Sequence, residues 1–138
     1  MKEKQINETH LGYIQNAIDR MSRCSFQSKA WNVTIVSALI ALYLTDRNNR
    51  SIIIIASIAT LLFMLLDMYY LYLERGFIKL YNLVAEIDVT ERVQDYSMSI
   101  PDSYKGLCSY LKAFLSVSTG LFYGAIIIAL LIFYFFIK

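Results

Sequence analysis

SIIIIASIATLLFMLLDMYYLYLERGFIKLYNLVAEI, residues 51–87, is an apolar run that changes into a charged amphipathic sequence without a proline or a loop signal. Because nothing in it marks a helix end, we expect one continuous helix. At 1.5 Å per residue, its roughly 37 residues would extend about 55 Å, well beyond the hydrocarbon thickness of about 30 Å. The sequence therefore predicts a transmembrane helix at 51–73 that continues into the cytoplasm as an extension at 74–87.

The extension carries apolar residues at heptad spacing over two repeats. These residues, which form a predicted oligomer seam, are Leu73, Phe77, Leu80, Val84 and Ile87. A seam needs a partner helix, which is either the N-terminal helix of this chain or a helix of a neighbouring subunit. Arg75 and Lys79 form a basic stripe elsewhere on the helix, and we expect this stripe to meet lipid phosphates or an anionic cytoplasmic ligand.

Composition places the chain in a membrane. Its 138 residues are 57% apolar, with a mean hydropathy of +0.48, which is more apolar surface than a single soluble core of this size can bury. The 13 basic and 11 acidic residues give a net charge of only +2. This balance excludes a dedicated binder of duplex nucleic acid.

The rest of the chain divides into four parts after a polar start that we expect to be frayed. Residues 10–29 predict an amphipathic cytoplasmic helix, which lies on the membrane surface or packs on the projecting extension. Residues 30–45 predict a first transmembrane span, 88–112 a cytoplasmic connection, and the uncharged run 113–137 a third span. The expected fold is a single-domain, all-α integral membrane protein with an amphipathic helix and three transmembrane helices.

Three spans put the two termini on opposite sides of the membrane. Ten of the 13 basic residues lie in the N-terminal segment or between Arg75 and Lys112, and the other three lie in the turn at 46–50 or at the C-terminus. Because basic loops are retained in the cytoplasm, this distribution predicts a cytoplasmic N-terminus.

Asp67 is the residue that most needs an explanation. It lies about 16 residues into its span, some 24 Å from the external end, where a short carboxylate does not easily reach water. Lys29, Lys112 and Tyr70 are the candidate partners at similar depth. The carboxylate then serves either as half of a structural ion pair or as a charge that changes partner when a pore opens.

The third span begins with a face of small residues. Ser116, Gly120 and Gly124 recur every four residues, a pattern that allows close helix packing in lipid. Three interpretations remain open: contact between subunits, packing within one chain, or the lining of a narrow pore. In the last case Ser116 and Thr119 supply the polar lining.

No catalytic constellation is present in the sequence. His10 is the only histidine, and the chain has no glycine-rich phosphate loop, no CxxC and no HExxH motif. A zinc site would need further nitrogen or sulfur ligands. We therefore expect no enzyme activity, no cofactor and no metal site.

Three stretches carry a resemblance to a known family. RMSRCSFQSKAW leads into the first span, LLDMYYLYLERGFIKLY runs out of the second, and Phe122 and Tyr123 form an aromatic pair in the third. In these the chain resembles small bacterial membrane proteins encoded in anti-phage defence operons beside nucleotidyltransferase-type enzymes, and in particular the Hailong-type membrane effector. The resemblance implies an oligomeric, pore-forming effector of the inner membrane that is held closed or triggered by a nucleic-acid-derived signal, a single-stranded DNA oligomer in the Hailong case. It assigns no individual functional residue.

Three functional classes follow. The first is an ion-conducting defence effector, a homo-oligomer and by expectation a tetramer, because three spans are too few to enclose a pathway alone. In this class a ligand at the basic stripe moves the inner end of the second span, where Asp67 lies, through the continuous helix. The second class is a holin-like lysis protein. The third is a non-conducting membrane anchor for a cytoplasmic enzyme.

Overall fold

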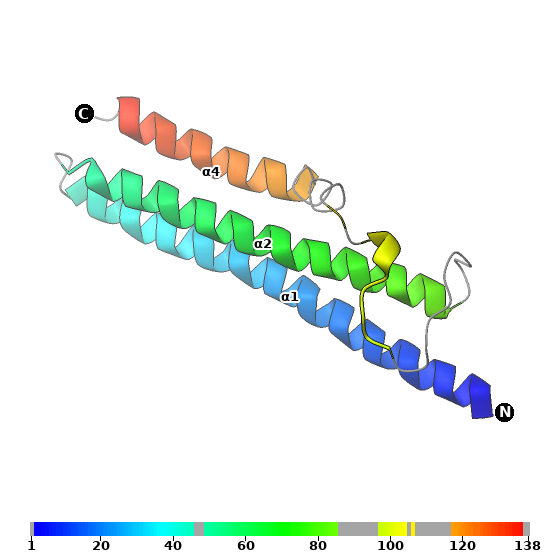
Figure 1. Ribbon diagram of the computed structural model, residues 1–138. Coiled ribbons are helices and arrows are strands. Elements are labelled where there is room, and N and C mark those ends of the chain that lie inside the picture. The colour runs from blue at the N-terminus through cyan, green and yellow to red at the C-terminus, as the bar shows by residue number, and fades with distance from the viewer. Residues whose placement is uncertain (1, 46–48, 86–96, 105, 107–116, 137–138) are drawn as a thin grey trace. The chain divides into compact units, whose positions relative to one another are not determined.

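The computed structural model of the chain describes residues 2–45, 49–85, 97–104, 106 and 117–136. In these ranges the secondary structure is entirely helical, with helices α1 (Lys2–Thr45), α2 (Ser51–Val84) and α4 (Val117–Phe136) and the short 3₁₀ helix η1 (Asp102–Tyr104) (Figure 1). The all-α expectation is confirmed for the described residues, none of which forms a strand.

Helix α1 differs from the expectation at its N-terminal end and in its middle. The predicted amphipathic helix at 10–29 and the predicted span at 30–45 form one uninterrupted helix, which begins at Lys2 and so includes residues expected to be frayed. The change in hydropathy between Lys29 and Ala30 predicts a boundary there. No proline or glycine accompanies that change, so nothing in the backbone ends the helix.

Burial explains why α1 continues. Its inward positions recur at spacings of four, three and four residues, an 11-residue repeat that stays on one face of a nearly straight helix. The buried residues of this stripe are His10, Ile14, Ala17, Met21, Ser25, Ser28, Asn32, Val36 and Tyr43. Because the stripe crosses the change in hydropathy without a shift of register, the polar and apolar halves of α1 bury the same face.

Helix α2 is continuous, as the sequence predicted, from Ser51 through Val84. Its start is fixed by backbone bonds from Ile52 N to Asn49 O and from Ile53 N to Arg50 O, each 3.2 Å long. The predicted end at Ile87 lies outside the described residues, as do residues 113–116 and 137 of the predicted third span and most of the 88–112 connection. The 20 residues of α4 correspond to a length of about 30 Å.

The chain divides into two compact units, which we call the first unit (Met1–Cys24 with Tyr69–Ala113) and the second unit (Ser25–Met68 with Phe114–Lys138). In the first unit, Leu80 of the predicted seam is 1% exposed. The other described seam residues, Leu73, Phe77 and Val84, are half-buried. The N-terminal part of α1 belongs to the same compact unit as these seam residues.

A segment from 97 to 104 completes the first unit. Nε2 of His10 lies 2.9 Å from the carbonyl oxygen of Ser97 and donates to it as the Nε2–H tautomer. The segment packs closely on α2 at Gly76, where an added Cβ would lie 2.9 Å from Cδ1 of Ile100. Gly76 therefore permits a contact that no other residue would allow without a shift of Ile100.

The second unit has a dry core at one end. Its buried apolar cluster consists of Val36, Tyr43, Ile52, Ile53, Ala56 and Leu130. The same helices expose large apolar side chains on their outward faces, including Leu42, Ile54, Ile55, Ile58, Leu61, Leu62, Leu65, Leu121, Ile128, Leu131 and Phe135. Helices α1 and α2 are long and apolar enough to cross a membrane, whereas the apolar part of α4 that the structure describes, Thr119–Phe135, is shorter.

Candidate functional site

The second unit contains a buried ion pair between α1 and α2. Nζ of Lys29 lies 2.9 Å from Oδ2 of Asp67 and donates a hydrogen bond of 3.1 Å to Oδ1. The hydroxyl of Ser25 donates a short hydrogen bond to the same Oδ1 and accepts one of 3.2 Å from Lys29. Ser25 and Lys29 are one helical turn apart on α1, so both reach a single carboxylate on the facing helix.

Burial differs sharply between the two charges. Asp67 is fully buried, whereas the side chain of Lys29 is 17% exposed. A lysine with a long apolar stem can keep its ammonium group close to solvent, but a one-carbon carboxylate in the middle of a helix bundle cannot. Of the predicted partners, the structure places Lys29 on the carboxylate. Tyr70 packs on Tyr69 instead, with ring centroids 5.9 Å apart, and Lys112 lies outside the described residues.

Helix α4 reaches the same site from the other side. The hydroxyl of Tyr123 donates to the carbonyl oxygen of Phe63 over 3.2 Å, and nearer the other end of α2 the Arg50 guanidinium lies 5.5 Å from the Tyr134 ring centroid. These two contacts make α2 and α4 antiparallel. Thr119, four residues before Tyr123, is therefore level with Asp67, four residues after Phe63.

Several buried polar atoms around this level lack a hydrogen-bond partner within the described structure. They are Oγ1 of Thr119, both side-chain polar atoms of Asn32, and Oδ2 of Asp67, whose only partner is the ionic contact with Lys29. Asn32 is 0% exposed and Thr119 is 1% exposed. A buried polar group without a partner costs about 1–3 kcal/mol, so these atoms lower the stability of the second unit.

The interior of the second unit thus changes from polar to apolar along its length. Ser25, Asn32 and Asp67 occupy one end, and Thr60 follows, with its hydroxyl bonded to the carbonyl oxygen of Ala56 over 2.8 Å. Beyond Thr60 lies the dry core defined above. The buried polar side chains of the second unit are therefore concentrated toward the Ser25 end, and the buried apolar cluster lies beyond Thr60.

The small-residue face of α4 is open. A Cβ added at Gly120 or Gly124 would meet no atom within 4 Å apart from the helix's own neighbouring backbone. No described residue of the chain packs closely on either glycine. Thr119 faces inward, away from this open surface, and Ser116 lies outside the described residues.

The basic stripe of α2 lies in the first unit. Arg75 and Lys79 are both half-buried, and Lys79 forms no ion pair with a described residue. The ring of Tyr104 stacks on that of Tyr72, with centroids 5.3 Å apart. Burial raises the pKa of the Tyr104 phenol, an effect that the Arg75 guanidinium opposes, so the phenol stays neutral at physiological pH.

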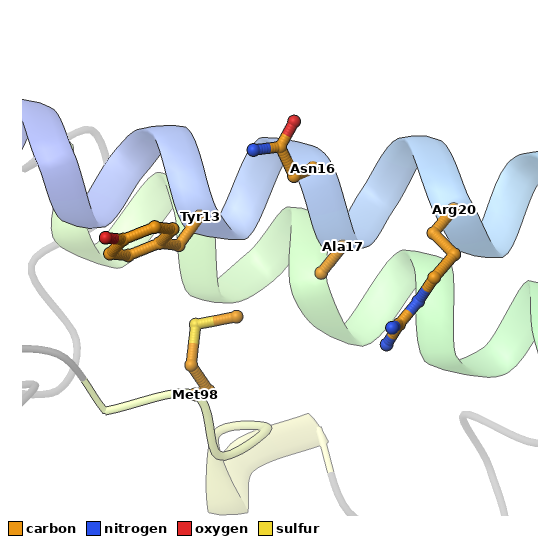
Figure 2. A pocket seen from close by; sticks show the side chains of 5 residues that line it. All are labelled: Tyr13, Asn16, Ala17, Arg20 and Met98. Carbon is orange, nitrogen blue, oxygen red and sulfur yellow. The ribbon is translucent and has the colours of Figure 1, made fainter.

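A cleft in the first unit was not predicted from the sequence. Figure 2 shows its lining: Tyr13, Asn16, Ala17 and Arg20 project from α1 and Met98 faces them. Its volume is about 560 Å³. The Arg20 guanidinium forms no hydrogen bond or ion pair with a described residue, and the exposed ring of Tyr13 lines the same cleft.

The described part of the chain contains no group of three His, Cys, Asp or Glu side chains that could hold a metal ion. The single histidine is already bonded to Ser97. No protein-family model matches the chain, and comparisons with curated proteins and with solved structures find no match either. The geometry of the buried ion pair is therefore the main basis for assigning a function.

Sequence reasoning missed Ser25, Asn32 and Tyr123 as parts of this site. Tyr123 was recognised only as half of an aromatic pair. The 11-residue repeat contains the missing signal, because it places Ser25 and Asn32 on the same stripe as the apolar residues of α1.

Proposed function

We propose that this chain is the subunit of an oligomeric, pore-forming effector of the bacterial cytoplasmic membrane, which depolarises the cell in an anti-phage response. In this proposal α1, α2 and α4 each cross the bilayer, and the N-terminus faces the cytoplasm. The chain is not an enzyme. A nucleotidyltransferase encoded beside it is the source of the signal that controls it, as the resemblance to the Hailong-type effector implies.

One observation carries the proposal: the second unit has an apolar exterior and buries the Lys29–Asp67 ion pair and other polar side chains at one end of its interior. In the most apolar stretches of α1 and α2, only 22% and 33% of the residues are buried. A core helix of a soluble protein would be mostly buried. A fully buried carboxylate, an amide and hydroxyls lie inside instead. Ionisable groups inside a membrane bundle are costly and mark ion or proton pathways.

The pathway is proposed to form between copies of the chain or by rearrangement of its helices. The dry core closes the interior of a single second unit beyond Thr60. Gly120 and Gly124 offer an open face on which another helix can pack closely. We therefore propose a homo-oligomer, a tetramer, assembled through this face of α4.

Control is proposed to come from an anionic oligonucleotide that binds the first unit. Arg20 in the cleft and Lys79 on the basic stripe are cations without an ion pair among the described residues. Helix α2 contributes residues to both units and is unbroken, so a ligand that binds one arrangement of the first unit better than another can bias the pore.

The closed interior favours one alternative, a non-conducting membrane anchor whose first unit docks a cytoplasmic enzyme. A measurement of ion flux distinguishes the pore-forming effector from the membrane anchor. Purified protein in liposomes is expected to dissipate a K⁺ gradient, and Gly120→Leu with Gly124→Leu is expected to lower both the flux and the oligomer mass. Ala125→Leu, a similar enlargement at an exposed position of the same helix, is the matched control. An anchor would give no flux in any variant.

A further inference from the structure

The buried ion pair resembles a binding site for a cation, in which the ammonium group of Lys29 takes the place of a bound ion. Nζ of Lys29 contacts three oxygen positions, Oδ1 and Oδ2 of Asp67 and Oγ of Ser25, at 3.1, 2.9 and 3.2 Å. An ammonium group resembles K⁺ in size and charge, and proteins hold such ions by replacing their hydration shell with oxygen atoms. We propose that Asp67 and Ser25 form a binding site for a small monovalent cation, which the ammonium group of Lys29 occupies as a tethered substitute.

The two sides of the site are unequally fixed, which makes an exchange possible. Asp67 is 0% exposed and Ser25 is 5% exposed, and they lie on two helices that pack on each other. Lys29 holds its ammonium at the end of a flexible stem and already reaches the surface with 17% of its side chain exposed. When that stem withdraws, the carboxylate stays in place and needs another positive charge, because an unpaired buried charge is strongly unfavourable.

The second unit contains further buried oxygen atoms without a hydrogen-bond partner among the described residues. Oγ1 of Thr119 is level with Asp67 and has no partner, and the side-chain oxygen of Asn32 is a second buried acceptor without a donor. Hydroxyl, carboxamide and carboxylate oxygens are the ligands that hard cations prefer. A single carboxylate balances one positive charge, so the site favours a monovalent over a divalent ion. In the proposed pore it would favour cations, and only this consequence rests on the proposed function.

Replacement of the tethered cation by a free one is the test. In the purified full-length protein, Lys29→Ala is expected to lower the melting temperature in choline chloride, whose cation is too large for the site. KCl or NH₄Cl at equal ionic strength is expected to restore about 5 °C at tenfold excess over the dissociation constant. Wild type should respond little. Arg23→Ala, which removes an exposed charge from the same helix, should show no dependence on the cation.

Adding Asp67→Asn to Lys29→Ala is expected to abolish the cation effect. Equal melting temperatures of Lys29→Ala in choline, K⁺ and NH₄⁺ would overturn the proposal. Lys29→Met, which keeps the apolar stem, serves as a second variant. If neither variant folds in choline or in KCl, the proposal also fails, since a bound K⁺ should have replaced the ammonium. Cation-dependent stability without liposome flux would retain the site and reject the pore.

Discussion

The coupling between Lys29 and Asp67 gives the sharpest prediction about stability. Lys29→Met leaves a fully buried carboxylate without its counter-charge, and breaking a buried pair in this way costs about 3–5 kcal/mol. Asp67→Asn is expected to cost less, about 1.5–3 kcal/mol, the value of a hydrogen bond to a charged group. The smaller cost follows because Ser25 can still donate to the amide oxygen and Lys29 can extend toward solvent.

The double variant distinguishes a coupled pair from two independent contributions. Lys29→Met combined with Asp67→Asn contains no buried charge, so it is expected to be more stable than Lys29→Met alone. The free energy of unfolding is measured by titration with SDS in mixed micelles, with choline as the main cation and the fluorescence of Trp31, the only tryptophan, as the probe. If the double variant lost as much free energy of unfolding as the two single variants lose together, the coupling would be refuted.

Two further predictions concern close packing and unpaired polar groups. Gly76→Ala is expected to loosen the 97–104 segment and speed its proteolysis, because the new Cβ would lie 2.9 Å from Ile100. Gly12→Ala is the control: its Cβ would meet nothing within 4 Å, so it is expected to stabilise α1 by up to about 1 kcal/mol. Equal proteolysis of the two variants would contradict this contact. Asn32→Leu removes buried polar atoms without a partner, so it is expected to raise stability by about 1–3 kcal/mol while lowering liposome flux. A loss of stability with unchanged flux would show that Asn32 has only a structural role.

The continuity of α2 was predictable because its signal is local. No proline or turn sequence interrupts residues 51–84, and a single helix was expected through the change from apolar to charged residues. The need of Asp67 for a basic partner was also local in origin, since any carboxylate at that depth must be compensated. Identifying Lys29 as a partner required the packing of α1 on α2, which sequence spacing does not specify.

The continuity of α1 was missed because hydropathy outweighed periodicity. The change near Lys29 looked like a boundary between a surface helix and a span, although the buried stripe crosses it in register. Arg20 and Met98, which line one cleft, are far apart in the sequence, so no local pattern joins them. The open glycine face raises the same difficulty, because only the three-dimensional arrangement shows which side of α4 the chain itself covers.

Cation flux through the purified protein tests the central claim most directly. Wild-type protein is reconstituted into liposomes with K⁺ inside and choline outside, and the membrane potential is followed with a voltage-sensitive dye. Insertion is verified by protection of α2 and α4 from protease. The proposed function predicts protein-dependent flux that rises more steeply than linearly with the protein-to-lipid ratio and falls in Asp67→Asn. Fully inserted protein that generates no K⁺ diffusion potential at any ratio, with or without an added single-stranded oligonucleotide, would contradict it.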